Sequence, residues 1–426
     1  MTHITLMRPP MRIPLSVLAL LGALNVNAAD LPEADKLPVH KGLPDPLVML
    51  DGTPVRTADE WTKKRRPELR NLIQHYMYGY LPAPAKVTAK IDREDAKALG
   101  GKATLREITL TVGRASERIH LLLVVPNDRT GPVPVFVGMN FNGNHALLED
   151  PAVRLPAAWM YPGPGVKNGK AAETGRGKQK ESWDIAQAVD RGYAVATFYS
   201  GDADPDRAKE RGGLRPTFDK AGKAGTIAFW AWSISRVVDY LVTRPDLDPK
   251  RIIVFGHSRL GKTALLAAAM DDRMAMAIPS QAGCGGTAPS RGTVGESVER
   301  INTAFPHWFN AEFKKFNKEP ARLPFDQHSL LALVAPRPVL FSNAVEDTWA
   351  NPDGQFEVLK AAEPVYKLLG AGGLDSPKKP KVGTLSAGTL GYFIRAGKHS
   401  TTSEDWKAFL DFADRHVGKP AKKTKE

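Results

Sequence analysis

Short runs of apolar residues recur along this chain, separated by longer stretches with helical periodicity. Five runs are rich in β-branched and aromatic residues and are bounded by turn residues: 133–138, 194–199, 252–255, 275–279 and 339–343. Such runs are typical of buried parallel strands. Two earlier segments, 105–112 and 119–125, alternate apolar and polar residues and predict a half-exposed antiparallel pair. Helical stretches are expected at 182–191, 226–243, 261–270 and 354–369. This order predicts an α/β fold with a mostly parallel central sheet flanked by helices.

The segment 251–262, RIIVFGHSRLGK, carries the strongest chemical signal. Its β-branched run breaks at Gly256, presents Ser258 and passes into a helix-forming stretch. A strand-to-helix turn this tight strains the residue at its apex and exposes the serine oxygen at a helix N-terminus, where backbone N–H groups can stabilise an oxyanion. The second glycine, Gly261, comes one residue later than in the generic G-x-S-x-G pattern. We nevertheless predict a nucleophile elbow in an α/β-hydrolase fold.

Two stretches look like insertions into this fold. Residues 144–181 and 201–225 are rich in Gly, Pro, Lys and Arg, and they follow the predicted strands 133–138 and 194–199. Loops that leave the carboxyl ends of parallel strands build the functional site in α/β folds. We therefore expect these insertions to wall the substrate cleft.

A serine nucleophile needs a base, and the base needs an orienting carboxylate. In α/β-hydrolases the chain order is Ser, acid, His, so the base must follow the late strands. His416 lies within a predicted helix, whereas His399 directly follows the strand-like residues 391–395. His399 is therefore the predicted base. His257 flanks the serine, and we expect its side chain to point away from the site.

The elbow form G-x-S-R-x-G-K resembles that of the glucuronoyl esterases, carbohydrate esterase family 15 or 4-O-methyl-glucuronoyl methylesterases, which cut the ester between lignin alcohols and (4-O-methyl)glucuronic acid on xylan. Further matching segments are 278–286, 295–298, 301–302, 347–352 and His399. The resemblance covers about residues 40–417 and is greatest to the bacterial branch. It implies an α/β-hydrolase fold and a serine esterase activity.

Within this family the acid has two possible places. Fungal members carry a glutamate at the position that matches Gln281, and glutamine cannot stabilise an imidazolium as a carboxylate does. Some bacterial members keep the acid on the loop after the next strand, here 345–352. The resemblance therefore implies Asp347, which matches the D-x-W of the family, with the adjacent Glu346 as the alternative acid.

The resemblance also implies the remaining roles. Arg259 would supply its backbone N–H and its guanidinium to the oxyanion. Lys262, Glu296 and Trp349 match positions that contact the glucuronate ring. A surface lysine, a solvated glutamate and a core tryptophan are the ordinary alternatives. The implied reaction is acyl transfer through an acyl-enzyme, which needs no metal ion or organic cofactor.

Three other functions stay open at this stage. Residues 256–263 satisfy the phosphate-binding pattern G-x-x-x-x-G-K-[ST], although an exported protein meets little ATP and the later family motifs have no place in an ATPase. An acetyl-xylan or feruloyl-type serine esterase would share the triad but need no pocket for a uronate sugar. An inactive carbohydrate-binding relative would keep the fold without turnover.

The N-terminus predicts export. Arg8 and Arg12 precede the apolar stretch 13–24, which is too short to span a bilayer and is followed by a small-residue cleavage signal ending at Ala28. We expect a signal peptide at 1–28, a periplasmic or extracellular protein, and no stable membrane insertion after cleavage. A single esterase domain at 29–417 and a disordered basic tail at 418–426 would follow.

The net charge of +13 adds little to this picture. The basic cluster Lys63–Arg66 has no nucleic-acid recognition motif beside it, so we expect no nucleic-acid partner. A basic surface suits a uronate-bearing polymer, and the expected partner is a glucuronoxylan or lignin–carbohydrate ester bound by a monomer. The single cysteine, Cys284, excludes an internal disulfide.

Overall fold

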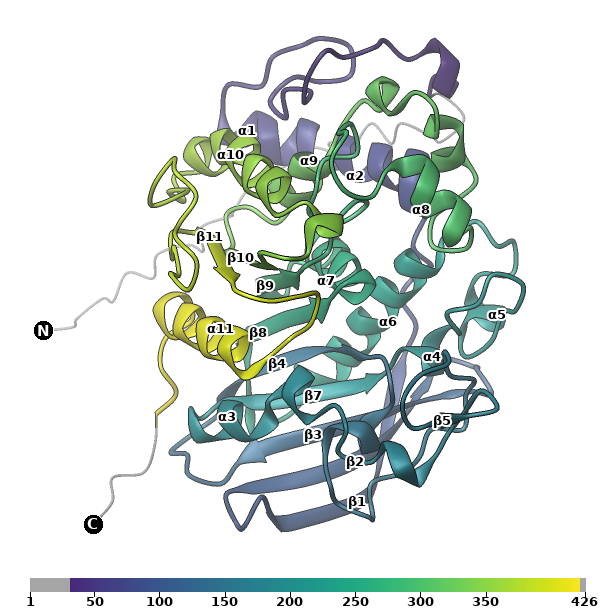
Figure 1. The fold of residues 1–426 in the computed structure, drawn as a ribbon, viewed down its shortest axis with the longest axis vertical. Coiled ribbons are helices and arrows are strands. Elements are labelled where there is room, and N and C mark those ends of the chain that lie inside the picture. The colour runs from purple at the N-terminus through teal and green to yellow at the C-terminus, as the bar shows by residue number, and fades with distance from the viewer. Residues whose placement is uncertain (1–30, 422–426) are drawn as a thin grey trace, which may run out of the picture. The chain divides into compact units, whose positions relative to one another are not determined.

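The computed structural model describes residues 31–421. Within them, nine strands form the central sheet in the order β1-β2-β3-β7-β4-β8-β9-β10-β11 (Figure 1). The pairs β1–β2, β2–β3 and β3–β7 are antiparallel, and the pairs from β7 to β11 are parallel. The strands are β1 Val87–Ala98, β2 Ala103–Val112, β3 Arg118–Pro126, β4 Val133–Asn140, β7 Ala194–Tyr199, β8 Leu247–His257, β9 Met274–Ser280, β10 Val339–Ala344 and β11 Leu390–Arg395.

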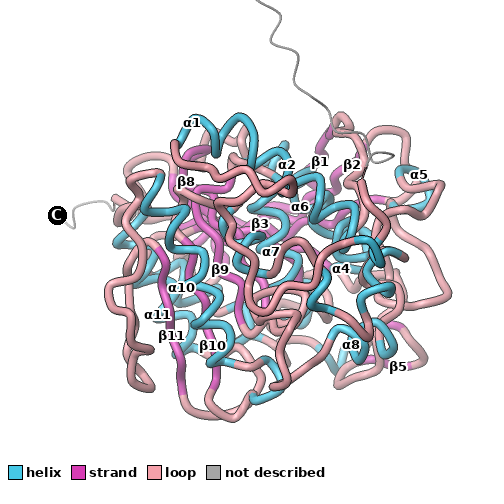
Figure 2. Tube along the Cα trace, turned by 90° about the horizontal axis from the view of Figure 1, so that it is seen from above, coloured by secondary structure: helices cyan, strands magenta, loops and turns pink. Residues whose placement is uncertain are grey.

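Helices pack on both faces of this sheet, and Figure 2 shows the magenta strands enclosed by cyan helices. On one face α6 and α7 pack together against β4 and β8, while α3 and α11 cover the other face. The helices are α1 Ala58–Glu60, α2 Arg66–Ile73, α3 Ile185–Asp190, α4 Ser200–Ala203, α5 Arg215–Phe218, α6 Thr226–Leu241, α7 Arg259–Met270, α8 Val298–Ala304, α9 Gln327–Ala332, α10 Pro352–Leu368 and α11 Ser403–His416. A two-stranded ribbon, β5 Val166–Lys167 and β6 Lys170–Ala171, lies in the first insertion.

The central strands are buried on both faces. Every residue of β4, β7 and β10 is buried, as the apolar runs predicted, because helices cover both sides of a parallel sheet. Every residue of β11, whose sequence was described only as strand-like, is buried as well. By contrast, β1 is mostly exposed and charged, and its sequence did not predict a strand. It lies at the sheet edge, where charged side chains oppose pairing with another chain.

One large buried cluster lies between the sheet and the helices α3 and α11. Trp183, Phe255 and Trp406 meet in it, with ring centroids 5.0 to 5.9 Å apart. This packing fixes the end of β8, from which the elbow leaves, against the segment that precedes α3. The core therefore supports the site directly.

Most residues for which the sequence analysis made predictions about the chain ends are not described by this structure. The signal peptide at 1–28 and residues 422–426 of the basic tail lie outside the described residues. Within 31–421, no helix has both the length and the apolar character that crossing a membrane requires.

Candidate active site

Ser258 occupies the turn between β8 and α7. Its backbone has φ 56° and ψ −128°, a positive-φ conformation that is uncommon outside glycine and marks local strain. The Ser258 backbone N–H donates to the Ser280 carbonyl at 2.9 Å, and Ser258 is the N-cap of α7. The serine thus lies at a helix N-terminus, where N–H groups without intrahelical acceptors can bind an oxyanion.

Two glycines permit this turn. A Cβ on Gly256 would lie 2.0 Å from the carbonyl oxygen of Leu260, and a Cβ on Gly261 would lie 2.9 Å from that of Ser280. Residue 260, where the generic motif has glycine, is a leucine only 2% exposed. The close approach falls at residue 261 instead, which explains the unusual spacing. Because α7 already begins at Arg259, no loop remains before Gly261 to surround a phosphate, and the phosphate-binding alternative is wrong.

His399 and Asp347 form a short hydrogen bond. The His399 Nδ1 donates to Asp347 Oδ2 at 2.7 Å. The carboxylate is buried, with 3% of its side chain exposed, whereas 41% of the histidine side chain is exposed. The second carboxylate oxygen, Oδ1, accepts from the Ala350 backbone N–H at 3.3 Å. This fixes the orientation of the carboxylate and leaves the outer edge of the imidazole accessible.

The register of two neighbouring strands brings this pair together. β10 and β11 are parallel, with Ala344 opposite Arg395. Their exit loops stay paired, because the Glu346 backbone N–H donates to the Gly397 carbonyl at 3.0 Å. Asp347 and His399 follow at once on these loops. The side chain of Glu346 is exposed, so it has no comparable contact with the base.

Gln281 and Arg395 hold the loop that carries His399. Gln281 Nε2 donates to the Ser400 carbonyl at 2.6 Å, and its Oε1 accepts from the Ser400 N–H at 3.1 Å. Arg395 donates to the same carbonyl at 2.6 Å and forms a buried ion pair with Asp405 at 2.6 Å. Gln281 is therefore a tether for the base, a role that the sequence analysis did not assign.

His257 contacts the predicted base. Its ring centroid lies 4.5 Å from that of His399, with the planes tilted by 41°. The expectation that His257 points away from the site is wrong. Burial, together with the charges of His399 and Arg259, holds the pKa of His257 well below its ordinary value, so it stays neutral beside His399.

Arg259 is held by a carboxylate from the second insertion. Its Nε lies 2.6 Å from Asp206 Oδ2 in an ion pair. The other oxygen, Oδ1, accepts hydrogen bonds from His307 Nε2 at 2.8 Å and Trp308 Nε1 at 2.7 Å. Burial alone would raise the pKa of Asp206, but these hydrogen bonds and the Arg259 charge bring it below its ordinary value. Asp206 is therefore ionised at neutral pH.

Aromatic rings surround the same guanidinium. The Arg259 Cζ lies 4.6 Å from the centroid of Phe141 and 5.8 Å from those of Tyr161 and Trp308. Cation–π contacts and the ion pair together restrict the guanidinium to one region. The sequence analysis did not identify Asp206, His307 and Trp308 as neighbours of Arg259. An aspartate that follows a proline in an insertion gives no sign that it will contact residues about a hundred positions further along the chain.

Lys262 and Glu296 form a buried pair. They are 3% and 9% exposed, so the alternatives of a surface lysine and a solvated glutamate are wrong. Lys262 Nζ donates to the carbonyls of Ala282 at 2.7 Å and Cys284 at 2.5 Å, and lies 3.4 Å from Glu296 Oε2. Its three N–H donors are thus occupied by the protein in this state.

Trp349 lies at the surface beside that pair. It is 44% exposed, which rules out a core tryptophan, and the guanidinium of Arg300 lies 4.5 Å from its ring centroid. The Glu296 backbone N–H donates to the Trp349 carbonyl at 3.0 Å. The structure thus brings Lys262, Glu296 and Trp349 together on adjoining segments, and their contact with the glucuronate ring stays a prediction.

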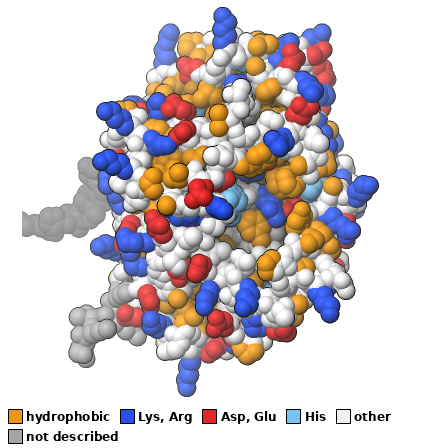
Figure 3. Space-filling view, viewed as in Figure 1, with side chains coloured by type: hydrophobic (Ala, Val, Ile, Leu, Met, Phe, Trp, Pro, Cys, Tyr) orange, Lys and Arg blue, Asp and Glu red, His pale blue; other side chains and the backbone are white. Residues whose placement is uncertain are grey.

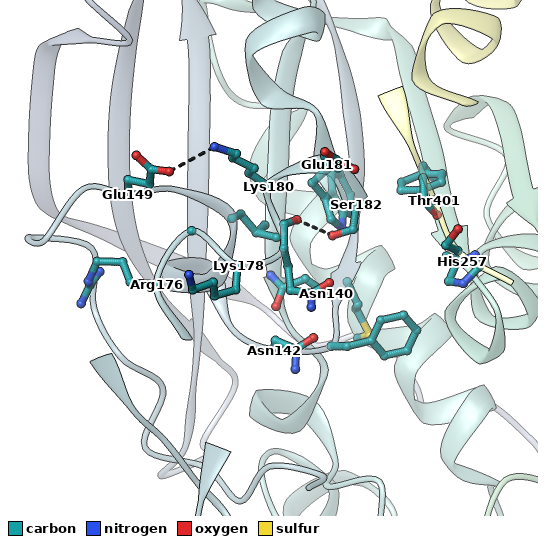
Figure 4. A pocket seen from close by; sticks show the side chains of 18 of the residues that line it. Asn140, Asn142, Glu149, Arg176, Lys178, Lys180, Glu181, Ser182, His257 and Thr401 are labelled. Carbon is teal, nitrogen blue, oxygen red and sulfur yellow. Dashed lines mark hydrogen bonds and ion pairs between the residues drawn. The ribbon is translucent and has the colours of Figure 1, made fainter. Parts of the chain in front are cut away.

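A cavity of about 610 Å³ borders the predicted base. The face drawn in Figure 3 is hollowed near its middle, where a histidine is visible. In Figure 4, Lys178 and Lys180 of the first insertion lie on one side of the cavity, and His257 and Thr401 on the other. The insertion 144–181 therefore does wall a cleft beside His399.

No group of metal-binding side chains occurs among residues 31–421. The side chains gathered here instead include a serine on a strained turn, a base with a buried carboxylate, and a restrained arginine at the helix N-terminus. Such a set can carry out nucleophilic acyl transfer.

The chain is similar to known esterases over most of its length. A family model described as "Glucuronyl esterase, fungi" matches residues 180–370. The carbohydrate esterase MZ0003, from an unknown prokaryotic organism, is 44% identical over 88% of this chain and 89% of its own. The solved glucuronoyl esterase of Solibacter usitatus superposes with a TM-score of 0.83 at 37% identity, covering 90% of this chain and 100% of that one.

The chain belongs to the glucuronoyl esterase family. The predicted family and the predicted α/β-hydrolase fold are therefore confirmed. A 4-O-methyl-glucuronoyl methylesterase of Phanerochaete carnosa is 28% identical over 77% of this chain and 72% of its own. The two prokaryotic relatives named above are more identical to this chain, at 44% and 37%, in agreement with the predicted bacterial branch.

Proposed function

We propose that this chain is a serine esterase that hydrolyses the ester between (4-O-methyl-)glucuronic acid of glucuronoxylan and lignin alcohols. As a member of the glucuronoyl esterase family it is a carboxylic ester hydrolase. The observation that carries the proposal is the 2.7 Å hydrogen bond between His399 and the buried Asp347, on loops next to the elbow of Ser258.

In the first step Ser258 Oγ attacks the C6 carbonyl of the uronate ester while His399 takes its proton. Asp347 keeps the imidazole in the tautomer that accepts at Nε2, and it stabilises the imidazolium that forms. His399 then protonates the oxygen of the leaving alcohol, and an acyl-enzyme remains. Water repeats the sequence and releases glucuronic acid.

Arg259 stabilises the tetrahedral intermediate. Its backbone N–H at the start of α7 and its guanidinium both donate to the developing oxyanion. The ion pair with Asp206 and the surrounding rings restrain the guanidinium before substrate binds, so little reorganisation accompanies the reaction.

Lys262, Glu296 and Trp349 recognise the sugar. Trp349 offers an exposed ring face to the pyranose, and the Glu296 carboxylate, held by the buried Lys262, offers an acceptor for its hydroxyls. A site built from buried polar groups rejects ligands that leave those groups unpaired. Methyl glucuronate should therefore be cut much faster than methyl galacturonate or 4-nitrophenyl acetate.

The substrate comparison, with Ser258→Ala as control, tests the proposal. The variant should retain the fold, judged by circular dichroism, and lose several orders of magnitude in kcat on benzyl or methyl glucuronate. A simple acetate ester as the best substrate would favour the acetyl-esterase alternative. Near-normal turnover by the folded Ser258→Ala variant would overturn the assignment of the nucleophile.

The setting of this activity is also part of the proposal. Export, predicted from residues 1–28, suits an enzyme whose polymeric substrate lies outside the cell. A basic, monomeric enzyme that binds no nucleic acid and is free of the membrane after signal cleavage fits the same setting. Every step uses protein side chains and water.

A further inference from the structure

One hydrogen bond anchors the ring of the predicted base, His399, within residues 31–421. Its Nδ1 donates to Asp347 Oδ2 at 2.7 Å, and 41% of the side chain is exposed. The bond to Cβ and this hydrogen bond define an axis about which the imidazole can still turn. Turning moves Nε2 away from the Ser258 hydroxyl, and a displacement of about 1 Å in a reacting group can cost about a hundredfold in rate. The plane of the imidazole therefore needs a second restraint.

His257 offers a flat surface to that ring. It is the last residue of β8, directly before Ser258. Its ring centroid lies 4.5 Å from that of His399, with the planes tilted by 41°, and flat rings at this separation are in contact. We propose that His257 is a positioning residue, whose ring holds the imidazole of His399 in the plane that lets Nε2 reach Ser258. The inference rests on the proposed function, because it takes His399 as the base.

The order of the strands explains how the two histidines meet. Because β9 and β10 separate β8 from β11, the loop after β11 must cross the ends of these strands to reach His257. Gln281, directly after β9, forms two hydrogen bonds with the backbone of Ser400, at 2.6 and 3.1 Å. These bonds draw the loop across the end of β10. The tether of the base therefore also brings His399 against His257.

His257 is itself held in place. Its backbone lies in register with Ser280 of β9, and Phe141, from the loop after β4, meets its ring at an interplanar angle of 89°, with centroids 6.3 Å apart. Phe141 also contacts the Arg259 guanidinium, at 4.6 Å from the ring centroid. A side chain locked by its own packing can hold a neighbour in a fixed geometry. The row of contacts that starts at Arg259 therefore ends on the base.

The contact depends on the ring of His257 and on none of its polar atoms. Its Nδ1 is buried and has no hydrogen-bond partner in the described part of the chain. Burial holds the pKa of His257 well below its ordinary value, and the charges of His399 and Arg259 lower it further. A neutral ring can stay packed against the imidazolium that forms on His399, whereas a second cation would repel it.

Three substitutions of His257 separate the flat ring from the polar group. His257→Phe is the conservative variant, because it keeps a flat ring without nitrogen atoms, and it should lose no more than about threefold in kcat on methyl glucuronate. His257→Ala and His257→Gln remove the ring, and each should lower kcat about ten- to hundredfold with KM within about twofold. The base is then misplaced while the sugar contacts remain. If the alanine variant fails to fold, judged by circular dichroism, the phenylalanine and glutamine variants still decide.

Benzyl glucuronate separates positioning from the shape of the cavity, because His257 also lines the cavity beside His399. A misplaced base slows acylation and deacylation whatever the alcohol. The loss of kcat in His257→Ala should therefore be the same on the methyl and benzyl esters to within about twofold. A loss confined to the benzyl ester would show that His257 acts through the shape of the cavity, and would overturn the inference.

His416→Ala is the matched control. His416 forms a ring pair of similar geometry with Phe412, with centroids 4.3 Å apart and planes tilted by 47°. It lies in the last turn of α11, about 20 Å along the helix from its first residue. Its removal should lower the melting temperature and leave kcat unchanged.

Two results at position 257 would contradict the proposed role. They are a loss of kcat in His257→Phe as large as in His257→Ala, and a normal kcat in folded His257→Gln. Failure of the proposed function is recognised separately. Wild-type protein would then cut neither ester, or His399→Ala would retain the wild-type kcat.

Discussion

Two aspartates hold His399 and Arg259, the residues proposed to act with the elbow serine, and they are placed in different ways. Asp347 leaves a central strand and meets His399 on the loop of the neighbouring strand, so sheet register alone brings them together. Asp206 lies in an insertion and gathers Arg259 with His307 and Trp308 from a third segment. The predicted base is thus positioned by the register of a parallel sheet, whereas Arg259 is positioned by an insertion and a segment distant in sequence.

The largest loss of activity is expected when the first of these contacts, between Asp347 and His399, is broken. Asp347→Ala should lower kcat on benzyl glucuronate by about three to four orders of magnitude, because His399 loses both its tautomer and its orientation. Glu346→Ala is the matched control on the adjacent, exposed residue and should stay within about twofold. Steady-state kinetics of both variants decide the assignment, and a Glu346 variant more damaged than the Asp347 variant would show that the other carboxylate is the acid.

Breaking the second contact, between Asp206 and Arg259, should lower kcat by a smaller factor. Asp206→Asn keeps the shape but removes the charge that pairs with Arg259, so the guanidinium loses its restraint while its charge remains. We expect kcat to fall about ten- to hundredfold with little change in KM. Glu210→Gln, an exposed change in the same insertion, is the control. An unchanged kcat in folded Asp206→Asn protein would show that Asp206 does not contribute to catalysis.

A smaller effect is expected at the tether of the base. Gln281→Ala removes two hydrogen bonds to the backbone of Ser400, next to His399. The expected loss in kcat is about fivefold, the scale of one net hydrogen bond, because Arg395 still holds the same carbonyl. The same measurement on Arg395→Lys, which keeps the charge paired with Asp405, would show whether the two tethers share the task.

The difference between these regions also explains what the sequence could predict. Buried strands and Ser258 were visible because apolar runs and the elbow pattern are local, and His399 follows a strand in the order that the fold requires. Asp347 was chosen over Glu346 because it matches the D-x-W of the family. The exposed edge strand β1 was missed because its residues are mostly polar. Asp206 was missed because its contact with His307 depends on tertiary packing across 101 positions.

The smallest predicted effect concerns pH. The pKa of Asp206 is lower in the folded protein than its ordinary value. A carboxyl with a depressed folded pKa stabilises the fold above its unfolded pKa and loses that contribution as the pH falls through the folded value. The stability lost on Asp206→Asn should therefore be greater at pH 7 than below about pH 4. Thermal unfolding of the wild type and the variant across this pH range measures the difference in their stability. A difference that grows as the pH falls would contradict the prediction.

The claim that the two aspartates act through different residues is tested most directly by a double-mutant cycle. The kcat on benzyl glucuronate is measured for wild type, Asp347→Asn, Asp206→Asn and the double variant. If Asp347 acts through His399 and Asp206 acts through Arg259, the two losses should combine to within about 0.5 kcal/mol in activation free energy. A double variant no slower than Asp347→Asn alone would show that both carboxylates serve the same group, and would contradict the account.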